Sequence, residues 1–261
     1  MPLSELAAEL TEWIRARVHE AGARGVVLGM SGGLDSSIAA VLCKRAFPDT
    51  TLGLILPCFS RQEDLEHARL VASVFRIETN EIELTPCFTL LHDRLQAAAR
   101  TARERAEAGE AIDLAAANLK PRLRMCCLYY FANSLHYLVV GTGNKSELAI
   151  GYFTKYGDGA VDILPLGDLL KTELRALAEL LGIPGEIIEK PPSAGLWEGQ
   201  TDEGEIGVHY ADLDRIIIAL EQGETHAMSC GSDPERVLRV KRMMEASRHK
   251  REHIPIFKRS R

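Results

Sequence analysis

The sequence lacks the features of membrane, secreted and metal–thiolate proteins. No apolar run approaches the roughly 20 residues that a membrane-spanning helix needs. The first residues, MPLSE, include no basic side chain, so we expect no signal peptide. The cysteines, at 43, 58, 87, 126, 127 and 230, form no C-x-x-C pair. We therefore expect reduced core thiols in a cytoplasmic protein, without a membrane partner, a zinc site or a catalytic thiol.

Positive charge is also scarce. The 261 residues include 31 Lys and Arg against 37 Asp and Glu, a net charge of −6, which argues against a nucleic-acid partner. Residues 234–261 differ, with ten Lys or Arg and three Glu. This basic tail is either a solvated helix or a segment that closes on an anionic ligand. The length and the 46% hydrophobic content predict one domain over residues 1–261.

The common phosphate-loop patterns are missing, but the stretch SGGLDSS at 31–37 is a glycine-rich loop of another kind. It lacks the lysine of G-x-x-x-x-G-K-[ST] and does not fit G-x-G-x-x-G. An apolar run at 26–30 precedes it and a helical pattern follows, so backbone N–H groups should point outward at a helix start, where an anion is favoured. Gly32 and Gly33 allow positive φ and a close approach to a ligand. A carboxylate here, Asp35, is explained mainly by a divalent cation beside the phosphate. Ordinary turn and N-cap chemistry is the alternative.

Strand and helix patterns alternate along the chain. Strands are predicted at 26–31, 51–57 and 137–141, with a weak one at 82–84, and helices at 3–18, 36–47 and 61–75. Residues 87–136 form a long, alanine-rich helical stretch, which can serve as a subunit contact or as part of the core. This pattern predicts an α/β fold, a Rossmann-like parallel sheet with helices on both faces.

A second polar turn, GTGNKSE at 141–147, follows the strand at 137–141. Ligands of such sheets bind beyond the carboxyl ends of the strands, so this turn and the loop at 31–37 should face one crevice. Two further polar stretches, at 151–159 and 190–207, lack apolar periodicity and are candidate lids.

Together, in this order and spacing, these segments resemble the NAD synthetase family of the adenine-nucleotide α-hydrolases. The resemblance runs from about Leu28 to His249 and Lys250, and it includes FTKYGDG at 153–159 and PPSAG at 191–195. It implies an ammonia-dependent ligase that adenylates the carboxylate of deamido-NAD with ATP and Mg²⁺ and forms NAD, AMP and pyrophosphate. It also implies a homodimer.

The resemblance assigns a role to individual residues. Asp35 and Lys171 would be catalytic, and Asp35 and Glu147 would bind magnesium. The residues expected to bind ATP are Gly29, Met30, Ser31, Gly32, Gly33, Leu34, Asp35, Ser36, Thr142, Lys171 and Ser193. Those expected to contact deamido-NAD are Arg122, Lys155, Asp162, His249 and Lys250. For two of these an alternative stays open: Asp162 could cap a strand end, and His249 could be an exposed tail residue.

The nitrogen donor is expected to be free ammonia. Glutamine-using members carry a glutaminase domain upstream, whereas here the loop at 31–37 lies close to Met1, and Lys155 within FTKYGDG also fits the ammonia type. The alternatives are another ATP pyrophosphatase that amidates or thiolates a different nucleotide, and a non-catalytic adenine-nucleotide sensor.

Overall fold

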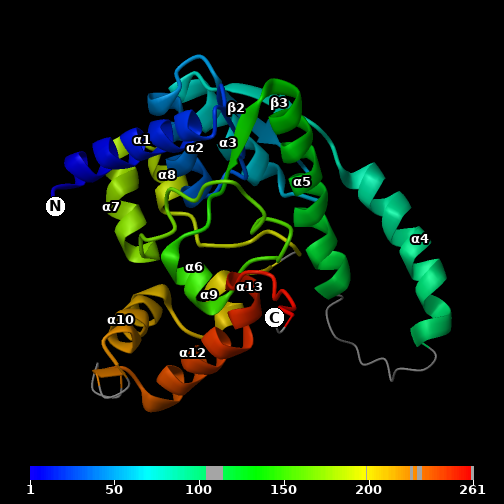
Figure 1. Ribbon diagram of the computed structural model, residues 1–261, viewed down its shortest axis with the longest axis vertical. Helices are drawn as coiled ribbons and strands as arrows, with labels where there is room; N and C mark the ends of the chain where they lie inside the picture. The colour runs from blue at the N-terminus through cyan, green and yellow to red at the C-terminus, as the bar shows by residue number, and fades with distance from the viewer. Residues whose placement is uncertain (104–113, 198, 224–225, 228–230, 260–261) are drawn as a thin grey trace.

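Four parallel strands form the centre of the computed structural model, which describes residues 1–103, 114–197, 199–223, 226–227 and 231–259 (Figure 1). The strands are β1 (Gly25–Gly29), β2 (Thr51–Ile55), β3 (Glu78–Glu81) and β4 (Tyr137–Val140), in the order β3-β2-β1-β4. Leu28 of β1 lies opposite Gly53 on one side and Val140 on the other. The predicted parallel sheet is confirmed, and its strand order reverses between β1 and β4.

The weak strand predicted at 82–84 is wrong. The edge strand β3 comprises Glu78–Glu81 instead, although the N–H of Ile82 still donates to the Ile55 carbonyl at 2.9 Å. β3 has the polar sequence ETNE and is largely exposed, so no apolar alternation marks it. The apolar residues that follow pack against the core and gave the misplaced signal.

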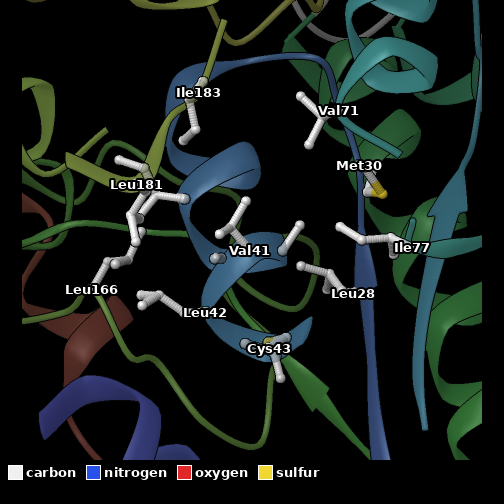
Figure 2. Packing of buried hydrophobic residues seen from close by; sticks show 14 of the residues in the cluster. Leu28, Met30, Val41, Leu42, Cys43, Val71, Ile77, Leu166, Leu181 and Ile183 are labelled. Atoms are coloured by element: carbon white, nitrogen blue, oxygen red, sulfur yellow. The ribbon is translucent and has the colours of Figure 1, made fainter. Parts of the chain in front are cut away.

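Helices cover both faces of the sheet, as the sequence pattern predicts. One face packs against α1 (Leu3–Glu20), α2 (Leu34–Ala46), α3 (Gln62–Phe75), α7 (Lys171–Leu181) and α8 (Gly185–Ile188). Because side chains alternate along a strand, Leu28 faces this cluster whereas Val27 faces the opposite one, which includes α5 (Leu114–Leu135). Figure 2 shows Val41 and Leu42 of α2 packed between Leu28 and Leu181.

A third buried cluster lies below the sheet in Figure 1 and consists mostly of helix residues. It joins α6 (Lys145–Ile150), α9 (Asp202–Ile206), α10 (Tyr210–Glu221) and α12 (Pro234–Ala246), and α13 (Arg248–Arg251) follows. Ile206, Leu213 and Val240 are fully buried within it. α9 falls inside the segment 190–207, which was expected to have no regular structure, so that expectation is wrong for its last residues.

The long helical stretch contains two helices, α4 (Thr85–Arg103) and α5, and residues 104–113 lie outside the described part of the chain. α4 projects from the rest of the molecule in Figure 1, and its Leu90 and Leu95 are 63% and 50% exposed.

Among the described residues, no helix is both long and apolar enough to cross a bilayer. The described cysteines are all free thiols, and Cys230 lies outside the described residues.

Candidate active site

A cavity of about 840 Å³ opens beyond the carboxyl ends of β1 and β4. Both predicted glycine-rich turns line it, at Ser31 and Thr142, together with parts of the two candidate lids. This is the position where open α/β sheets bind ligands, because the strand order reverses there. The predicted shared crevice is therefore confirmed.

The loop between β1 and α2 leaves the start of α2 open to a ligand. Gly33 is the N-cap residue of α2, and no side chain caps this end of the helix. The Ser36 and Ser37 hydroxyls donate back to the Gly33 carbonyl at 3.0 and 2.8 Å, which fixes the turn. The first N–H groups of α2 are thus available for an anion, in line with the interpretation of this loop as a phosphate site.

Only one of the two loop glycines has positive φ. Gly32 adopts φ +76°, and a Cβ there would lie 2.0 Å from the Asp64 carbonyl oxygen of α3. Gly33 has φ −91°, so the expectation of positive φ is wrong for this residue. An N-cap residue normally has extended backbone, which accounts for the difference.

Asp35, Glu147 and Lys171 come together in the cavity from the first turns of α2, α6 and α7. The Lys171 Nζ lies 2.7 Å from Asp35 Oδ1 and 3.6 Å from Glu147 Oε1. The amide of Asn144, which is fully buried, donates to Asp35 Oδ2 at 2.7 Å. Asn144 also forms a capping box with Glu147, so one residue holds both carboxylates in place.

The pKa values of Glu147 and Lys171 are shifted because two carboxylates and one ammonium group lie close together in a buried site. Burial and the nearby Asp35 charge raise the pKa of Glu147 to about 8, although Lys171 acts in the opposite direction. Burial disfavours the charge on Lys171, but the attraction of Asp35 and Glu147 outweighs it and raises the pKa of Lys171. Lys171 therefore stays protonated at neutral pH and carries a fixed positive charge into the cavity.

The two carboxylates fit magnesium chemically. Mg²⁺ prefers oxygen ligands, and it commonly takes one or two carboxylates and completes its shell with water and phosphate oxygens. Asp35 and Glu147 supply that number beside the open helix start. Within the described residues there is no cluster of three or more His, Cys, Asp or Glu that could hold a metal.

Almost all residues predicted to bind ATP line the cavity. They are Gly29, Met30, Ser31, Gly33, Leu34, Asp35, Ser36, Thr142, Lys171 and Ser193. Gly32 does not line it, because this residue packs against the backbone of α3. Ser193 is held by a hydrogen bond from its hydroxyl to the Gln200 carbonyl, 2.8 Å away.

Of the residues predicted to contact deamido-NAD, only Lys250 lines the cavity. Its ammonium donates to the carbonyls of Gly151 and Phe153 at 2.7 and 2.8 Å. Arg122, Lys155 and His249 lie outside the lining but contact one another: Arg122 donates to the Lys155 carbonyl at 3.3 Å, and Lys155 to the His249 carbonyl at 2.6 Å. The basic tail thus meets the loop at 151–159 through His249 and Lys250.

Asp162 lies outside the cavity lining as well. Its carboxylate accepts hydrogen bonds from the Val139 N–H at 2.7 Å and the Tyr129 hydroxyl at 3.1 Å. Burial and this carboxylate raise the pKa of Tyr129 to about 12. Asp162 therefore ties the 161–164 segment to β4, which agrees with the structural alternative, and its contact with a dinucleotide stays a prediction.

A set of residues that was not predicted from the sequence joins the two candidate lids. The Tyr152 hydroxyl donates to Asp202 Oδ1 at 3.2 Å and to Glu205 Oε2 at 2.8 Å, and the Tyr210 hydroxyl donates to Asp202 Oδ2 at 3.1 Å. Asp202 is 4% exposed. No local spacing links residues 50 positions apart, so only the fold reveals this network.

Arg124 was also missed. Its guanidinium lines the cavity and donates to the Leu56 carbonyl at 3.0 Å and the Ser60 hydroxyl at 3.3 Å. Burial lowers its pKa, and none of the carboxylates that the structure describes pairs with it within 4 Å. A cation without an anionic partner in a cavity is suited to an anionic ligand. No sequence signal marks it, because residues two apart in a helix do not share a face, and Arg122 accordingly lies outside the lining.

Comparisons with known proteins agree with this geometry. The family model described as NAD synthase matches residues 6–254. A protein named NH(3)-dependent NAD(+) synthetase from Carboxydothermus hydrogenoformans is 47% identical over 247 residues, which cover 95% of this chain and 94% of that protein.

Two solved structures are similar over nearly the whole chain. NMN synthetase from Francisella tularensis has a TM-score of 0.85 and 32% identity and covers 98% of both chains. NH3-dependent NAD synthetase from Campylobacter jejuni has a TM-score of 0.81 and 28% identity, over 99% of this chain and 100% of that one.

Proposed function

Because the chain belongs to the NAD synthase family, we propose that it is a carbon–nitrogen ligase that converts deamido-NAD to NAD. ATP is the co-substrate, free ammonia is the nitrogen donor, and AMP and pyrophosphate are the other products. The observation that carries the proposal is the meeting of Asp35, Glu147 and Lys171 at the open start of α2, inside the cavity.

In the first step, an oxygen of the nicotinate carboxylate attacks the α-phosphorus of ATP and pyrophosphate leaves. The β1–α2 loop presents backbone N–H groups to the phosphates, and Lys171 adds a fixed positive charge where negative charge develops. Asp35 and Glu147 would hold Mg²⁺, which when bound neutralises phosphate oxygens and orients them for in-line displacement.

In the second step, ammonia attacks the carbonyl carbon of the adenylated carboxylate and AMP leaves. No residue of the chain needs to form a covalent bond, because the activated carbonyl waits for ammonia. Water would hydrolyse the same intermediate, so the cavity must exclude it. The network of Tyr152, Asp202 and Tyr210 supports this role, since it joins the segments 151–159 and 190–207 over the cavity.

The acceptor is proposed to lie along the basic residues at the rim. Arg122, Lys155 and Lys250 gather positive charge from α5, the loop at 151–159 and the tail, and His249 lies beside Lys155. A dinucleotide diphosphate needs such cations in a chain with a net charge of −6. Asp162 would add a polar contact beside them.

We also propose a homodimer and a cytoplasmic location. The exposed apolar residues of α4 and α5, among them Leu90, Leu95 and Tyr130, support subunit contact, because large exposed apolar patches commonly mark interfaces. The free thiols of the described cysteines support a reducing compartment.

A pyrophosphate-release assay tests the function. We expect release with deamido-NAD and ammonium chloride, and little without an acceptor or with glutamine as the only nitrogen source. Nicotinate mononucleotide is the acceptor to compare, given the similarity to an NMN synthetase. Release that is faster with nicotinate mononucleotide would contradict the proposed substrate, and ATP binding without release under any condition would indicate a nucleotide sensor.

Matched variants test the site. Asp35→Asn should slow pyrophosphate release by about 100-fold or more, because the site loses one of the two carboxylates that would hold Mg²⁺ and the charge that pairs with Lys171. Lys145→Met is the control: this lysine also begins a helix near the cavity, but its ammonium pairs with Glu221 at 3.0 Å and Asp168 at 3.4 Å, away from the site. Equal loss in both variants would remove the assignment of Asp35.

A further inference from the structure

The start of α7, which carries Lys171, is capped from within only at Leu170, whose N–H donates to Glu173 Oε2 at 2.8 Å. Its N-cap residue is Leu170, whose side chain has no oxygen to accept a hydrogen bond from the helix. The first N–H groups of a helix need partners when they are buried. For the N–H groups of Lys171 and Thr172 those partners come from two other helices, α6 and α10, whereas the Glu173 N–H bonds to the Leu170 carbonyl at 3.0 Å.

Asp214 of α10 is one of these partners and also holds the other, Ser146 of α6. Its Oδ2 accepts from the Thr172 N–H at 2.9 Å and from the Thr172 hydroxyl at 2.8 Å. Its Oδ1 accepts a short hydrogen bond from the Ser146 hydroxyl, and the oxygen of that hydroxyl accepts from the Lys171 N–H at 2.9 Å. Asp214 is 3% exposed and Ser146 fully buried, so water does not compete for these bonds.

These hydrogen bonds involve the direct sequence neighbours of Glu147 and Lys171. Ser146 directly precedes Glu147 in α6, and Thr172 directly follows Lys171 in α7. A carboxylate at this position also interacts favourably with the dipole of α7. One buried side chain thus sets the distance between the helix starts that carry Lys171 and Glu147.

We propose that Asp214 is a positioning residue for the adenylation step, acting through Ser146 and the start of α7 on Lys171. It does not touch the cavity: the lining includes Lys171 and Thr172 but not Asp214. Its effect is therefore indirect, and depends on Lys171 being present. The inference rests on the proposed function in taking Lys171 as a contact of ATP.

Asp214→Ala removes all the bonds and the charge, and we expect kcat for pyrophosphate release to fall by about 100-fold, the effect of a misplacement of about 1 Å. Asp214→Asn keeps an oxygen that accepts from Thr172, and its amide can donate to Ser146, so it should restore kcat to within about tenfold of wild type. Asp212→Ala is the matched control, since this residue of the same helix pairs with Arg236 and Arg215 outside the site.

A double-mutant cycle on ATP affinity separates positioning from general stability. Without an acceptor, Asp214→Ala should weaken ATP binding about tenfold in the wild-type background and by less than twofold in the Lys171→Met background. Should Asp214→Ala fail to fold, Ser146→Ala removes the link between Asp214 and the Lys171 N–H and is tested in the same cycle. Circular dichroism and thermal melting identify the folded variants.

Two results would overturn the inference: equal weakening of ATP binding in both backgrounds, or a folded Asp214→Ala or Ser146→Ala variant with wild-type kcat and ATP affinity. Failure of the proposed function looks different. In that case the wild-type protein forms no NAD from deamido-NAD, while the cycle on ATP binding still reports on Asp214.

Discussion

Replacement of Gly32 by alanine should damage the nucleotide loop far more than the same change at Gly33. An alanine at φ +76° adopts a left-handed conformation, which costs about 1–2 kcal/mol. Its Cβ would also lie 2.0 Å from the Asp64 carbonyl oxygen, 2.9 Å from the Asp64 carbonyl carbon and 3.2 Å from the Ala68 nitrogen. The loop and α3 must therefore separate, and overpacking of this kind costs about 1–3 kcal/mol.

The two terms together predict a loss of about 2–5 kcal/mol in the free energy of unfolding for Gly32→Ala. Gly33→Ala should lose less than about 1 kcal/mol, because φ is −91° and the nearest atom to a Cβ is the Ser31 Oγ at 3.4 Å. The folded fraction of Gly32→Ala should also release pyrophosphate about 100-fold more slowly, since the loop N–H groups shift from the phosphates.

Urea denaturation followed by circular dichroism gives the free energies, and the pyrophosphate assay gives kcat for both variants. A loss below about 1 kcal/mol for Gly32→Ala, or equal losses for the two glycines, would refute the reasoning. It would mean that the contact between the loop and α3 is looser than the structure has it.

Further predictions concern titration, thiols and assembly. Glu147→Gln should reduce the change with pH in the free energy of unfolding of the ligand-free protein. In the wild type, the pKa of Glu147 is raised to about 8, so the folded state holds a proton that the unfolded state releases. The free energy of unfolding should therefore fall as pH rises from about 4.5 to 8. Urea denaturation at pH 5 and pH 8 measures this free energy, and an equal difference between the two pH values in both proteins would contradict the prediction. Iodoacetamide at pH 8 should label the exposed Cys87 and Cys126 but not Cys43, whose pKa burial raises to about 12; mass spectrometry locates the labels, and labelling of Cys43 in the folded protein would count against its burial. Leu95→Glu should shift the proposed dimer to monomer, because the charge falls on the exposed apolar part of α4; light scattering measures the mass, and Leu180→Glu, on another exposed helix face, is the control.

The sheet and the phosphate loop were predictable because their signals are local. Buried strands such as 26–30 are apolar throughout, and glycines mark the turn that follows. The placement of Glu147 opposite Asp35 followed from the rule that the carboxyl ends of parallel strands share an edge. The edge strand β3 was misplaced because exposed polar residues carry no such periodicity.

The contacts that complete the site were not predictable in this way. Asp214 bonds to Thr172, 42 positions away, and Lys171 contacts Asp35 across 136 positions. Such pairs depend on how α7 packs against α10 and α2, and no local pattern encodes that packing. The capping box of Asn144 and Glu147 was not predicted either, although its N-x-x-E spacing is local.

The central claim is that ATP is cleaved between its α- and β-phosphates by the carboxylate that becomes the amide of NAD. Deamido-NAD labelled with heavy oxygen at its nicotinate carboxylate tests this directly, with ammonium chloride as the nitrogen source. Since a carboxylate oxygen forms the bond to the α-phosphorus and leaves with it, we predict one labelled oxygen in each AMP, one retained in the carboxamide of NAD, and none in pyrophosphate. Label in pyrophosphate or inorganic phosphate, or unlabelled AMP alongside NAD, would contradict the account.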